Sequence, residues 1–423
     1  MNRAPRWIGA CAVAGLALRL AFALLYWTGQ PLTHDEREYL ALARSLARGE
    51  GYRYPADEAD PGTGQQFGRA PGYPAFLSAL VPPVAVDHVP PRVQVAQAAL
   101  GAVGIWLIGM IAARTAGPRA GIAAAAIAAV YPPLVWMPAY ALSEQLFSVV
   151  ALTIAVALQE KGAAPFSGVP FSGDAKKGAV PFFAGALVGV GILIRPVMVF
   201  FLPCAALWMV ARRAYIAAAI LVVTATLVVL PWTVRNHRVY GRWIAVASEG
   251  GVTFWTGNHP LARGDGDLAA NPDLKRAELA FRAAHRDLTP EQLEPLYYRD
   301  ATAWIRHNPG AWLALEARKA FYSIVPAGAS YAVHSAKYVA ASVVSYILVA
   351  IAAAAGAWRW HRAADAGPAP VALWLMAAAT LLSGLVFFPQ ERFRLPIIDP
   401  ALIVTAALLW IERNGRPGRH ADV

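Results

Sequence analysis

Two adjacent carboxylates follow directly after the first apolar segment of the chain. Asp35 and Glu36 stand in PLTHDEREYLALARSLARGEGY, whose apolar spacing predicts a helix from Asp35 to Leu46. A carboxylate within hydrogen-bond reach of a hydroxyl group can take its proton and act as a general base. The structural alternative is an acid that interacts with the dipole at a helix N-terminus. Taken alone, the pair fits both interpretations equally.

A further acid, Glu144, lies in AYALSEQLF at the start of another apolar segment. Ser143 is a candidate N-cap there, with Glu144 in the first helical turn. The predicted topology places Glu144 and Asp35 at the same depth on the same side of a membrane. Two such carboxylates could orient an acceptor, or bind a hard cation such as Mg²⁺ or Mn²⁺ through oxygen ligands.

Arginines predicted on that same side could bind phosphate, because a guanidinium group contacts phosphate oxygens bidentately. Arg195 is the strongest candidate, since apolar residues flank it on both sides and an ionisable group in such a segment is a functional hypothesis by default. In the segment ERFR, Glu391 could pair with a neighbouring arginine and fix its direction. The full candidate set for substrate binding is Arg69, Arg195, Arg235, Asn236, His259, Glu391, Arg392 and Arg394. The alternative for a lone arginine is a membrane anchor, and for a lone polar loop residue a solvated or capping role.

Other chemistries have weak or no support. The stretch WTGNHPLARGDGD contains Asp265 and Asp267, but it lacks the spacing and the terminal Glu of an EF-hand. No P-loop or dinucleotide fingerprint is present, so the sequence does not support use of a nucleotide sugar. Cys11 and Cys204 both lie within apolar segments, which predicts small packing residues rather than a disulfide or a metal site.

The composition indicates a membrane protein. Of 423 residues, 57% are hydrophobic and only 15% are charged, and the mean hydropathy is +0.44. A soluble chain of this length would need a far larger polar exterior. The net charge of +11 does not indicate nucleic-acid binding, because the basic residues form short clusters between apolar runs.

We predict about ten spans, because ten apolar runs approach the length needed to cross a hydrocarbon core of roughly 30 Å. They lie near 7–28, 92–114, 118–138, 142–159, 181–194, 197–211, 214–232, 338–358, 371–388 and 395–412. The first run is too long for a signal peptide and no clear cleavage site follows it, which predicts an uncleaved span. With the N-terminus in the cytoplasm the short basic loops fall inside, as the positive-inside rule requires. These loops carry Arg114 and Arg119, Lys161, Lys176 and Lys177, Arg212 and Arg213, and Arg359 and Arg362, and the basic tail follows from Arg413.

Two long polar segments, 29–91 and 233–337, remain on the outer side. The chain is thus predicted to divide into a membrane module (1–232), an outer segment (233–337) and a C-terminal membrane part (338–423). The outer segments are predicted to be helical: GRAPGYPAFLSALVPPV is too short to span and suits an interfacial helix. Asn271-Pro272, Thr289-Pro290 and Asn308-Pro309 are N-cap pairs, and Gln292 completes a capping box with Thr289.

Five motifs then occur in a familiar order: DEREYLALARSLARGEGY, GRAPGYPAFLSAL, YALSEQLF, LIRPV and FPQERFRLPIIDP. Together they resemble the GT-C membrane glycosyltransferases, in particular the bacterial branch similar to protein mannosyltransferases and the lipid A aminoarabinose transferase. The resemblance implies an all-α polytopic bundle whose first outer loop carries the catalytic Asp. Asp35 matches that position, with Glu36 beside it. Glu144 corresponds to the second acidic position, where other branches have Asp.

The resulting expectation is an inverting glycosyltransferase that moves a sugar from a polyprenyl phosphate to a hydroxyl acceptor on a lipid, glycan or protein. It would work at the outer face of the bacterial cytoplasmic membrane, with Asp35 as base and Arg195, with Arg392 or Arg394, at the leaving phosphate. A metal is not required, although Asp35 and Glu144 could hold Mg²⁺ or Mn²⁺. The alternatives are a transporter or flippase of lipid-linked glycans, which predicts mid-membrane polar residues and internal repeats, and a non-catalytic scaffold.

Overall fold

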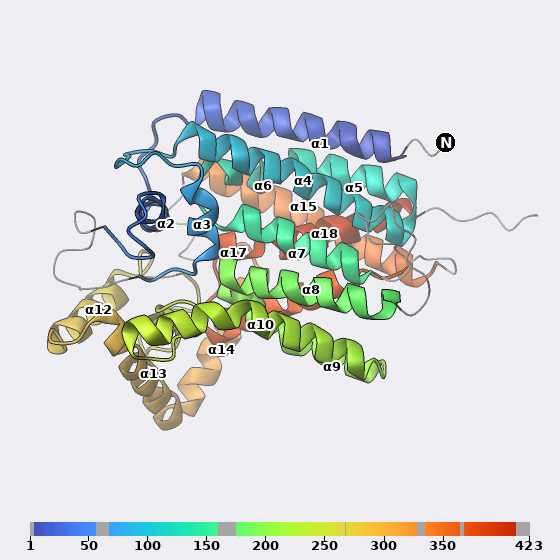
Figure 1. Ribbon diagram of the computed structural model, residues 1–423. Helices are drawn as coiled ribbons and strands as arrows, with labels where there is room; N and C mark the ends of the chain where they lie inside the picture. Colours follow the sequence, from blue (N-terminus) through green and yellow to red (C-terminus); the bar gives the residue numbers. More distant parts are fainter. Residues whose placement is uncertain are drawn as a thin grey trace, which may run out of the picture.

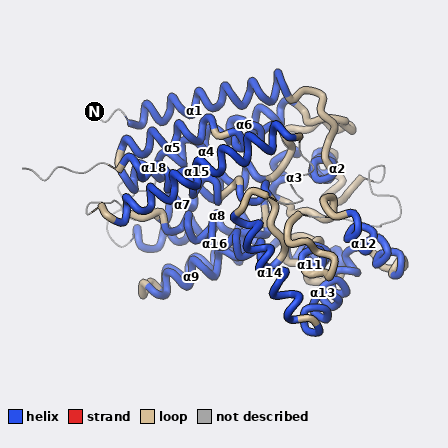
Figure 2. Tube along the Cα trace, turned by 180° about the vertical axis from the view of Figure 1, so that it is seen from behind, coloured by secondary structure: helices blue, strands red, loops and turns tan. Residues whose placement is uncertain are grey.

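The computed structural model describes residues 4–55, 67–159, 175–266, 268–327, 335–363 and 368–411, and the side chains of 175–179 are left aside. Within these ranges every regular element is a helix and no strand occurs (Figure 2), which confirms the predicted all-α class. Asp267, Lys161, Arg3 and the basic tail from Arg413 lie outside the described residues.

Long apolar helices form the bundle (Figure 1). Four of them have the length and composition to cross a membrane: α1 (Ala4–Ala21, continued by a π-helical turn over Phe22–Tyr26), α4 (Pro91–Ala116), α10 (Tyr215–Tyr240) and α15 (Ala336–His361). Shorter apolar helices pack among them: α7 (Glu144–Leu158), α8 (Ala175–Ile194), α9 (Phe201–Ala211), α16 (Val371–Val386) and α18 (Ile398–Ala407). The chain is therefore a multi-pass membrane protein, and each of these helices matches one predicted span.

The third predicted span is broken, which the sequence analysis did not anticipate. Its two parts, α5 (Pro118–Val130) and α6 (Pro132–Trp136, extended by a 3-10 turn over Met137–Ala139), meet at an angle of 64°. Two consecutive prolines begin α6, and a proline can neither donate a helical hydrogen bond nor fit against the preceding turn. The break therefore follows from the sequence YPP at the junction.

The polar segments gather at one end of the bundle, and the N-terminus lies at the other end (Figure 1). Their helices are α2 (His34–Ala47), α3 (Gly72–Ser78), α11 (Gly250–Gly257), α12 (Pro272–Ala284), α13 (Pro290–His307), α14 (Pro309–Ile324) and the single turn α17 (Glu391–Arg394). The second outer segment has a small apolar core of its own, made of Trp255, Leu274, Leu293, Tyr297 and Ala301.

Most of the local predictions are confirmed, and two need correction. Thr289 and Gln292 form the predicted capping box, and the Asn271 side chain accepts a hydrogen bond from the Leu274 amide. Asn308 does not cap α14, because its amide donates to the Trp304 carbonyl at the end of α13. The seventh span also extends further than predicted: α10 continues past residue 232 to Tyr240 and ends at a left-handed Gly241 (φ 67°). Both cysteines are free thiols that pack against the main core, as predicted.

Candidate active site

Asp35 lies between two guanidinium groups that come from distant parts of the chain. Its Oδ1 is 2.6 Å from Nη2 of Arg69, in the first outer segment, and its Oδ2 is 2.5 Å from Nη1 of Arg392, in α17. Burial alone raises the pKa of the Asp35 carboxyl group, but Arg69 and Arg392 outweigh that effect and hold the pKa well below its usual range. Asp35 is therefore ionised at neutral pH.

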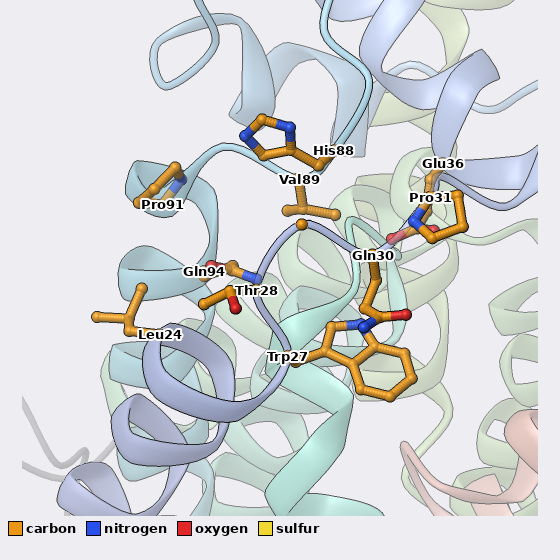
Figure 3. A pocket seen from close by; sticks show the side chains of 11 residues that line it. Leu24, Trp27, Thr28, Gln30, Pro31, Glu36, His88, Val89, Pro91 and Gln94 are labelled. Carbon is orange, nitrogen blue, oxygen red and sulfur yellow. The ribbon is translucent and has the colours of Figure 1, made fainter.

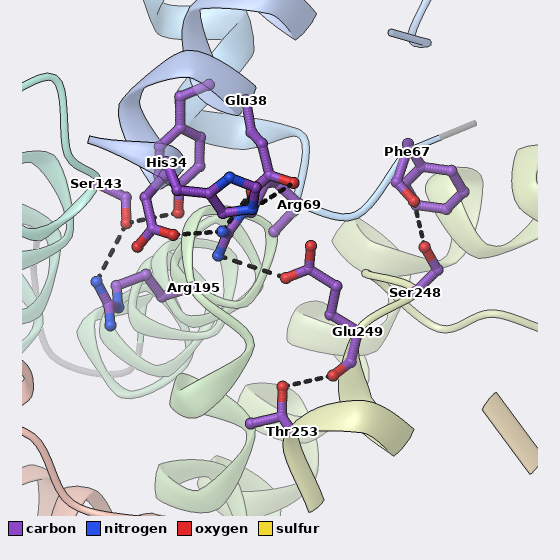
Figure 4. Close-up of polar contacts among 12 residues, drawn as sticks. His34, Glu38, Phe67, Arg69, Ser143, Arg195, Ser248, Glu249 and Thr253 are labelled. Atoms are coloured by element: carbon purple, nitrogen blue, oxygen red, sulfur yellow. Dashed lines mark hydrogen bonds and ion pairs between the residues drawn. The ribbon is translucent and has the colours of Figure 1, made fainter. Parts of the chain in front are cut away.

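Arg69 also contacts two acids that the sequence analysis missed. Glu38 accepts a hydrogen bond from Nε of Arg69 at 2.7 Å, and a Glu249 oxygen lies 3.4 Å from Nη1 of Arg69 (Figure 4). Glu38 stands one helical turn after Asp35 on α2, so the i,i+3 spacing was an available signal. Glu249 gave no such signal, because the fold alone brings it there. Burial raises the pKa of Glu249 to about 7, although Arg69 opposes the shift.

Arg195 and Glu144 form a second ion pair, with Nη1 of Arg195 2.5 Å from Oε1 of Glu144. The same nitrogen donates to Oγ of Ser143 at 3.2 Å (Figure 4). That hydroxyl lies 3.2 Å from the hydroxyl of Tyr39 on α2. Ser143 therefore does not cap α7 through its side chain, contrary to the structural alternative for this residue. It links α2 to Arg195 instead.

Two connections join these ion pairs into one unit. The ring of Phe393 lies 5.3 Å from the guanidinium carbon of Arg392 and 5.2 Å from that of Arg195. Tyr39 provides the other connection, since its ring lies 5.4 Å from Arg69 while its hydroxyl reaches Ser143. We call the whole set the outer charge cluster: Asp35, Glu38, Arg69, Glu144, Arg195, Glu249 and Arg392. The structure thus brings together Asp35, Glu144, Arg195 and the ERFR segment, as the sequence analysis required.

The cluster is nearly neutral and is partly open to solvent. Four carboxylates face three guanidinium groups, and the raised pKa of Glu249 leaves part of the fourth negative charge neutralised. The Arg392 side chain is 33% exposed, against 17% for Asp35 and for Arg195. Arg392 is therefore the member most open to an incoming anion.

Glu36 has a different environment from Asp35. Its Oε2 accepts from the amide and the hydroxyl of Thr33, both at 2.8 Å, and completes a capping box at the start of α2. Its Oε1 accepts from the Ala141 amide at 2.8 Å. Burial raises the pKa of the Glu36 carboxyl group. This residue holds the start of α2 against the loop before α7, and its contacts indicate a structural role rather than the predicted catalytic one.

Arg394 and Glu391 also serve packing. The buried Arg394 lies 3.3 Å from Asp399 and 4.0 Å from Glu391, and its guanidinium carbon is 3.9 Å from the ring centre of Tyr346. Glu391 also accepts a hydrogen bond from Ser342. Of the two ERFR arginines that the sequence left open, Arg392 is the one that contacts the outer charge cluster.

Three further candidates serve other contacts. Arg235 donates to the carbonyl of Tyr52 at 3.2 Å and packs over Trp232. Asn236 is fully buried and donates to the Ile244 carbonyl at 3.0 Å. His259 accepts a hydrogen bond from the Leu261 amide, and its ring packs at an angle of 46° against Trp255 in the small outer core. Each contact stabilises the outer segments, and none is with a member of the outer charge cluster.

The donor groups at Asp35 do not fit a divalent cation as they stand. Both of its carboxylate oxygens contact guanidinium groups, and Glu144 is paired with Arg195. Across the described ranges no three His, Cys, Asp or Glu side chains form a metal-binding group. Arginine side chains occupy the places that metal ligation would need, so we assign no step to a metal.

A cavity of about 140 Å³ lies beside the first turn of α2, between the outer ends of α1 and α4 (Figure 3). Trp27, Gln30, His88 and Gln94 contribute to its walls, and Glu36 closes one side. Its lining contains no arginine or lysine. The cavity therefore suits a neutral, hydroxyl-bearing group better than a phosphate.

No protein-family model and no curated protein matches the chain. Solved structures do match it at low sequence identity. The Archaeoglobus fulgidus oligosaccharyltransferase tethered with an acceptor peptide has a TM-score of 0.54 and 13% identity, over 95% of this chain and 49% of that one. AglB from Archaeoglobus fulgidus, in complex with an inhibitory peptide and a dolichol-phosphate, has a TM-score of 0.51 and 14% identity, over 95% and 50%.

ArnT from Cupriavidus metallidurans bound to undecaprenyl phosphate has a TM-score of 0.41 and 15% identity, over 91% of this chain and 78% of that one. The chain spans about half the length of the archaeal proteins that it matches. Their similarity extends over nearly the whole of this chain and concerns the fold. The polytopic chain shares its fold with these archaeal oligosaccharyltransferase structures, in agreement with the fold that the order of its motifs predicts.

Proposed function

We propose that the chain is a glycosyltransferase that moves a sugar from a polyprenyl phosphate to a hydroxyl acceptor, with inversion at the anomeric carbon. One observation carries the proposal: Asp35 lies between Arg69 and Arg392, beside the Arg195–Glu144 pair, at the end of the bundle where the polar segments gather. This arrangement combines a carboxylate base with cations for a phosphate at the rim of a membrane protein.

The donor phosphate would bind between Arg392 and Arg195. Their guanidinium groups lie on the same ring of Phe393, so both can turn toward one anion. Both arginines are paired with carboxylates here, and a phosphate would have to take over those contacts. Archaeoglobus fulgidus AglB, which has the same fold, is in complex with a dolichol-phosphate. That ligand supports a polyprenyl-phosphate donor for this chain.

Donor binding would also activate the base. While Arg69 and Arg392 both contact Asp35, its carboxylate has little affinity for a proton. A phosphate that draws Arg392 away removes one of these cations and raises the proton affinity of Asp35. The acceptor oxygen then attacks the anomeric carbon, the bond from that carbon to the phosphate oxygen breaks, and Asp35 takes the acceptor proton. The polyprenyl phosphate leaves with the electron pair, stabilised by Arg195 and Arg392.

The cavity beside Glu36 would receive part of the hydroxylated substrate, since its lining has no Arg or Lys for a phosphate. The basic short loops favour a site on the outer face of a bacterial cytoplasmic membrane. Acceptors on lipid, glycan or protein all agree with this location.

Purified protein incubated with synthetic polyprenyl-phosphate sugars tests the proposal directly. We expect release of polyprenyl phosphate that depends on an added acceptor, and a product whose anomeric configuration is opposite to that of the donor by NMR. Movement of the intact donor across a vesicle membrane without bond cleavage would instead support the transporter alternative. A product that retains the donor configuration would remove the single-displacement mechanism.

A further inference from the structure

The bend in the broken span leaves two backbone carbonyls without their helical donors. In a continuous helix the amides of residues 132 and 133 would donate to the carbonyls of Ala128 and Ala129. Pro132 and Pro133 occupy these positions, and a proline has no N–H group. Inside a bilayer an unsatisfied carbonyl is costly, because no water replaces the missing donor.

Arg19 of α1 supplies both missing donors. Its Nη1 donates to the Ala129 carbonyl at 3.1 Å, and its Nη2 donates to the Ala128 carbonyl at 3.0 Å. A third hydrogen bond joins Nη1 to the Gly15 carbonyl of its own helix at 3.0 Å. The planar fork of a guanidinium group suits two adjacent carbonyls, whereas a lysine ammonium is a single point of contact.

Two glycines make room for this side chain. A Cβ atom at Gly101 of α4 would lie 2.8 Å from both Cδ and Nε of Arg19, and one at Gly15 would lie 3.0 Å from its Nη1. Arg19 is only 1% exposed, and within the described residues no carboxylate forms a salt bridge with it. A buried cation without a counter-ion is expensive in a membrane, so its presence calls for a role.

The far arm of the bent span leads to the proposed catalytic acid. After α6, Gln94 of α4 donates to the Ala139 carbonyl at 3.2 Å, and the Ala141 amide donates to Glu36 at 2.8 Å. Glu36, the residue that follows Asp35 in the sequence, in turn caps α2 through its hydrogen bonds with Thr33. The direction of the arm beyond the bend therefore sets where α2 begins.

The bend also touches the other side of the site. Tyr131, the residue at the bend, donates from its hydroxyl to Asp399 at 2.9 Å. Asp399 lies 3.3 Å from Arg394, in the same helical turn as Arg392. A change in the bend would thus move both partners of the Asp35–Arg392 pair.

We propose that Arg19 is a positioning residue: it holds the bend of the broken span by replacing the two amide donors that Pro132 and Pro133 lack, and it thereby sets Asp35 against Arg392. The part of this inference that concerns catalysis rests on the proposed glycosyl transfer. The part that concerns the bend does not.

The test compares full-length Arg19→Met and Arg19→Lys proteins, each made in the wild-type background and in a Pro132→Ala/Pro133→Ala background. Hydrogen exchange in detergent, followed by mass spectrometry, reports on residues 128–141 and on the first turn of α2. Transfer kinetics with a synthetic polyprenyl-phosphate sugar report on the site. Arg114→Met is the matched control, because Arg114 also donates to a backbone carbonyl, that of Val156. Arg114 lies near the C-terminal end of α4, whereas Gln94, which contacts the bent span, lies near its N-terminal end.

We expect Arg19→Met to speed exchange over residues 128–141 and to lower kcat on the order of a hundredfold through misplacement of the base. The donor KM should stay within about threefold of wild type, since no phosphate contact is removed. Arg19→Lys should recover part of the loss. In the Pro132→Ala/Pro133→Ala background the added effect of Arg19→Met on exchange should be smaller, because amide donors are again present.

Unchanged exchange in Arg19→Met, or an effect of the same size in both backgrounds, would overturn the inference whether or not the protein transfers sugar. Arg19→Met protein that cannot be purified in either background would overturn it as well, while rescue by Pro132→Ala/Pro133→Ala would support it. If the wild-type protein shows no transfer while exchange behaves as expected, the proposed function fails and the role of Arg19 at the bend stands.

Discussion

The guanidinium group of Arg392 lies 2.5 Å from the carboxylate of Asp35, and this contact joins α17 to the first turn of α2. Asp35 follows the first span and Arg392 precedes the last one, so the pair closes the outer end of the bundle. The contact also pairs the candidate base with a candidate phosphate ligand. Binding of an anion and activation of the base are then linked through a single side chain.

Asp35→Asn should lower the transfer rate by about 10²-fold or more, because an amide cannot accept the acceptor proton. The substitution keeps the size of the side chain, so the protein should still fold and insert into membranes. Transfer kinetics together with size-exclusion profiles in detergent measure both effects. Asp273→Asn is a matched control, since Asp273 pairs with Arg276 on the exposed surface of α12. Wild-type turnover in Asp35→Asn would rule out Asp35 as the base.

The two ERFR arginines should respond differently to substitution. Arg392→Met should weaken donor binding and turnover with little effect on stability, because Arg392 is a third exposed. Arg394→Met should lower the free energy of unfolding by about 3 kcal/mol, since it removes a cation from the buried Asp399. Denaturation in detergent and donor titrations separate these outcomes. The assignment is contradicted if Arg394→Met weakens donor binding in a stable protein while Arg392→Met does not.

Substitution of Glu36 should separate structure from chemistry within the acidic pair. Glu36→Gln keeps an acceptor oxygen for the capping contacts and should retain transfer within about tenfold of wild type. Glu36→Ala removes the capping box and should lower the free energy of unfolding by about 1–2 kcal/mol. Thermal melting and transfer assays on the same preparations give the comparison. A complete loss of transfer in a stable Glu36→Gln protein would return Glu36 to a catalytic role.

Stability should fall as the pH rises from about 4.5 to about 8. Burial raises the pKa of Glu249 from 4.5 to about 7 and that of Glu294 to about 8. Each acid therefore binds more protons in the folded state than in the unfolded state within that range, so raising the pH favours unfolding. Asp35 acts in the opposite sense, and its stabilising contribution is lost only below the ordinary pKa of an aspartate.

Melting temperatures of wild-type and Glu249→Gln proteins between pH 4.5 and pH 8 test this sign. The variant should show a flatter dependence up to about pH 7, because it lacks one of the acids whose pKa is raised. Asp273→Asn, which removes a carboxylate from the exposed surface of α12, is the control. Identical slopes for wild-type and Glu249→Gln proteins would contradict the pKa shift of Glu249.

Chelation should have little effect on transfer. Both oxygens of Asp35 already contact guanidinium groups, which supply the positive charge that a metal would otherwise bring. Activity in EDTA should stay within about twofold of that with added Mg²⁺ or Mn²⁺, because arginines already stabilise the negative charge of the departing phosphate. Loss of activity in EDTA that Mn²⁺ restores would mean that a cation displaces Arg392 from Asp35.

Features that depend on nearby residues could be predicted from the sequence. The apolar runs located the spans, since crossing a bilayer requires about twenty apolar residues in succession. The capping box of Thr289 and Gln292 could also be predicted, because a helix cap depends only on residues within one turn of each other. The order of the motifs also indicated the GT-C fold and brought Asp35, Glu144, Arg195 and the ERFR segment into one hypothesis.

Only the tertiary structure decided which partner each charged group takes. Glu36 caps α2 while Asp35 meets Arg392, although the two acids are neighbours in the sequence. Arg392 faces the cluster and Arg394 faces Asp399, a choice that depends on how a single turn packs between helices. In the sequence, Arg19 is a single charged residue within an apolar run. Its role depends on two carbonyls of another helix that lack amide donors because prolines follow them. Such pairings join residues that are far apart in the chain, so local patterns of composition and spacing do not encode them.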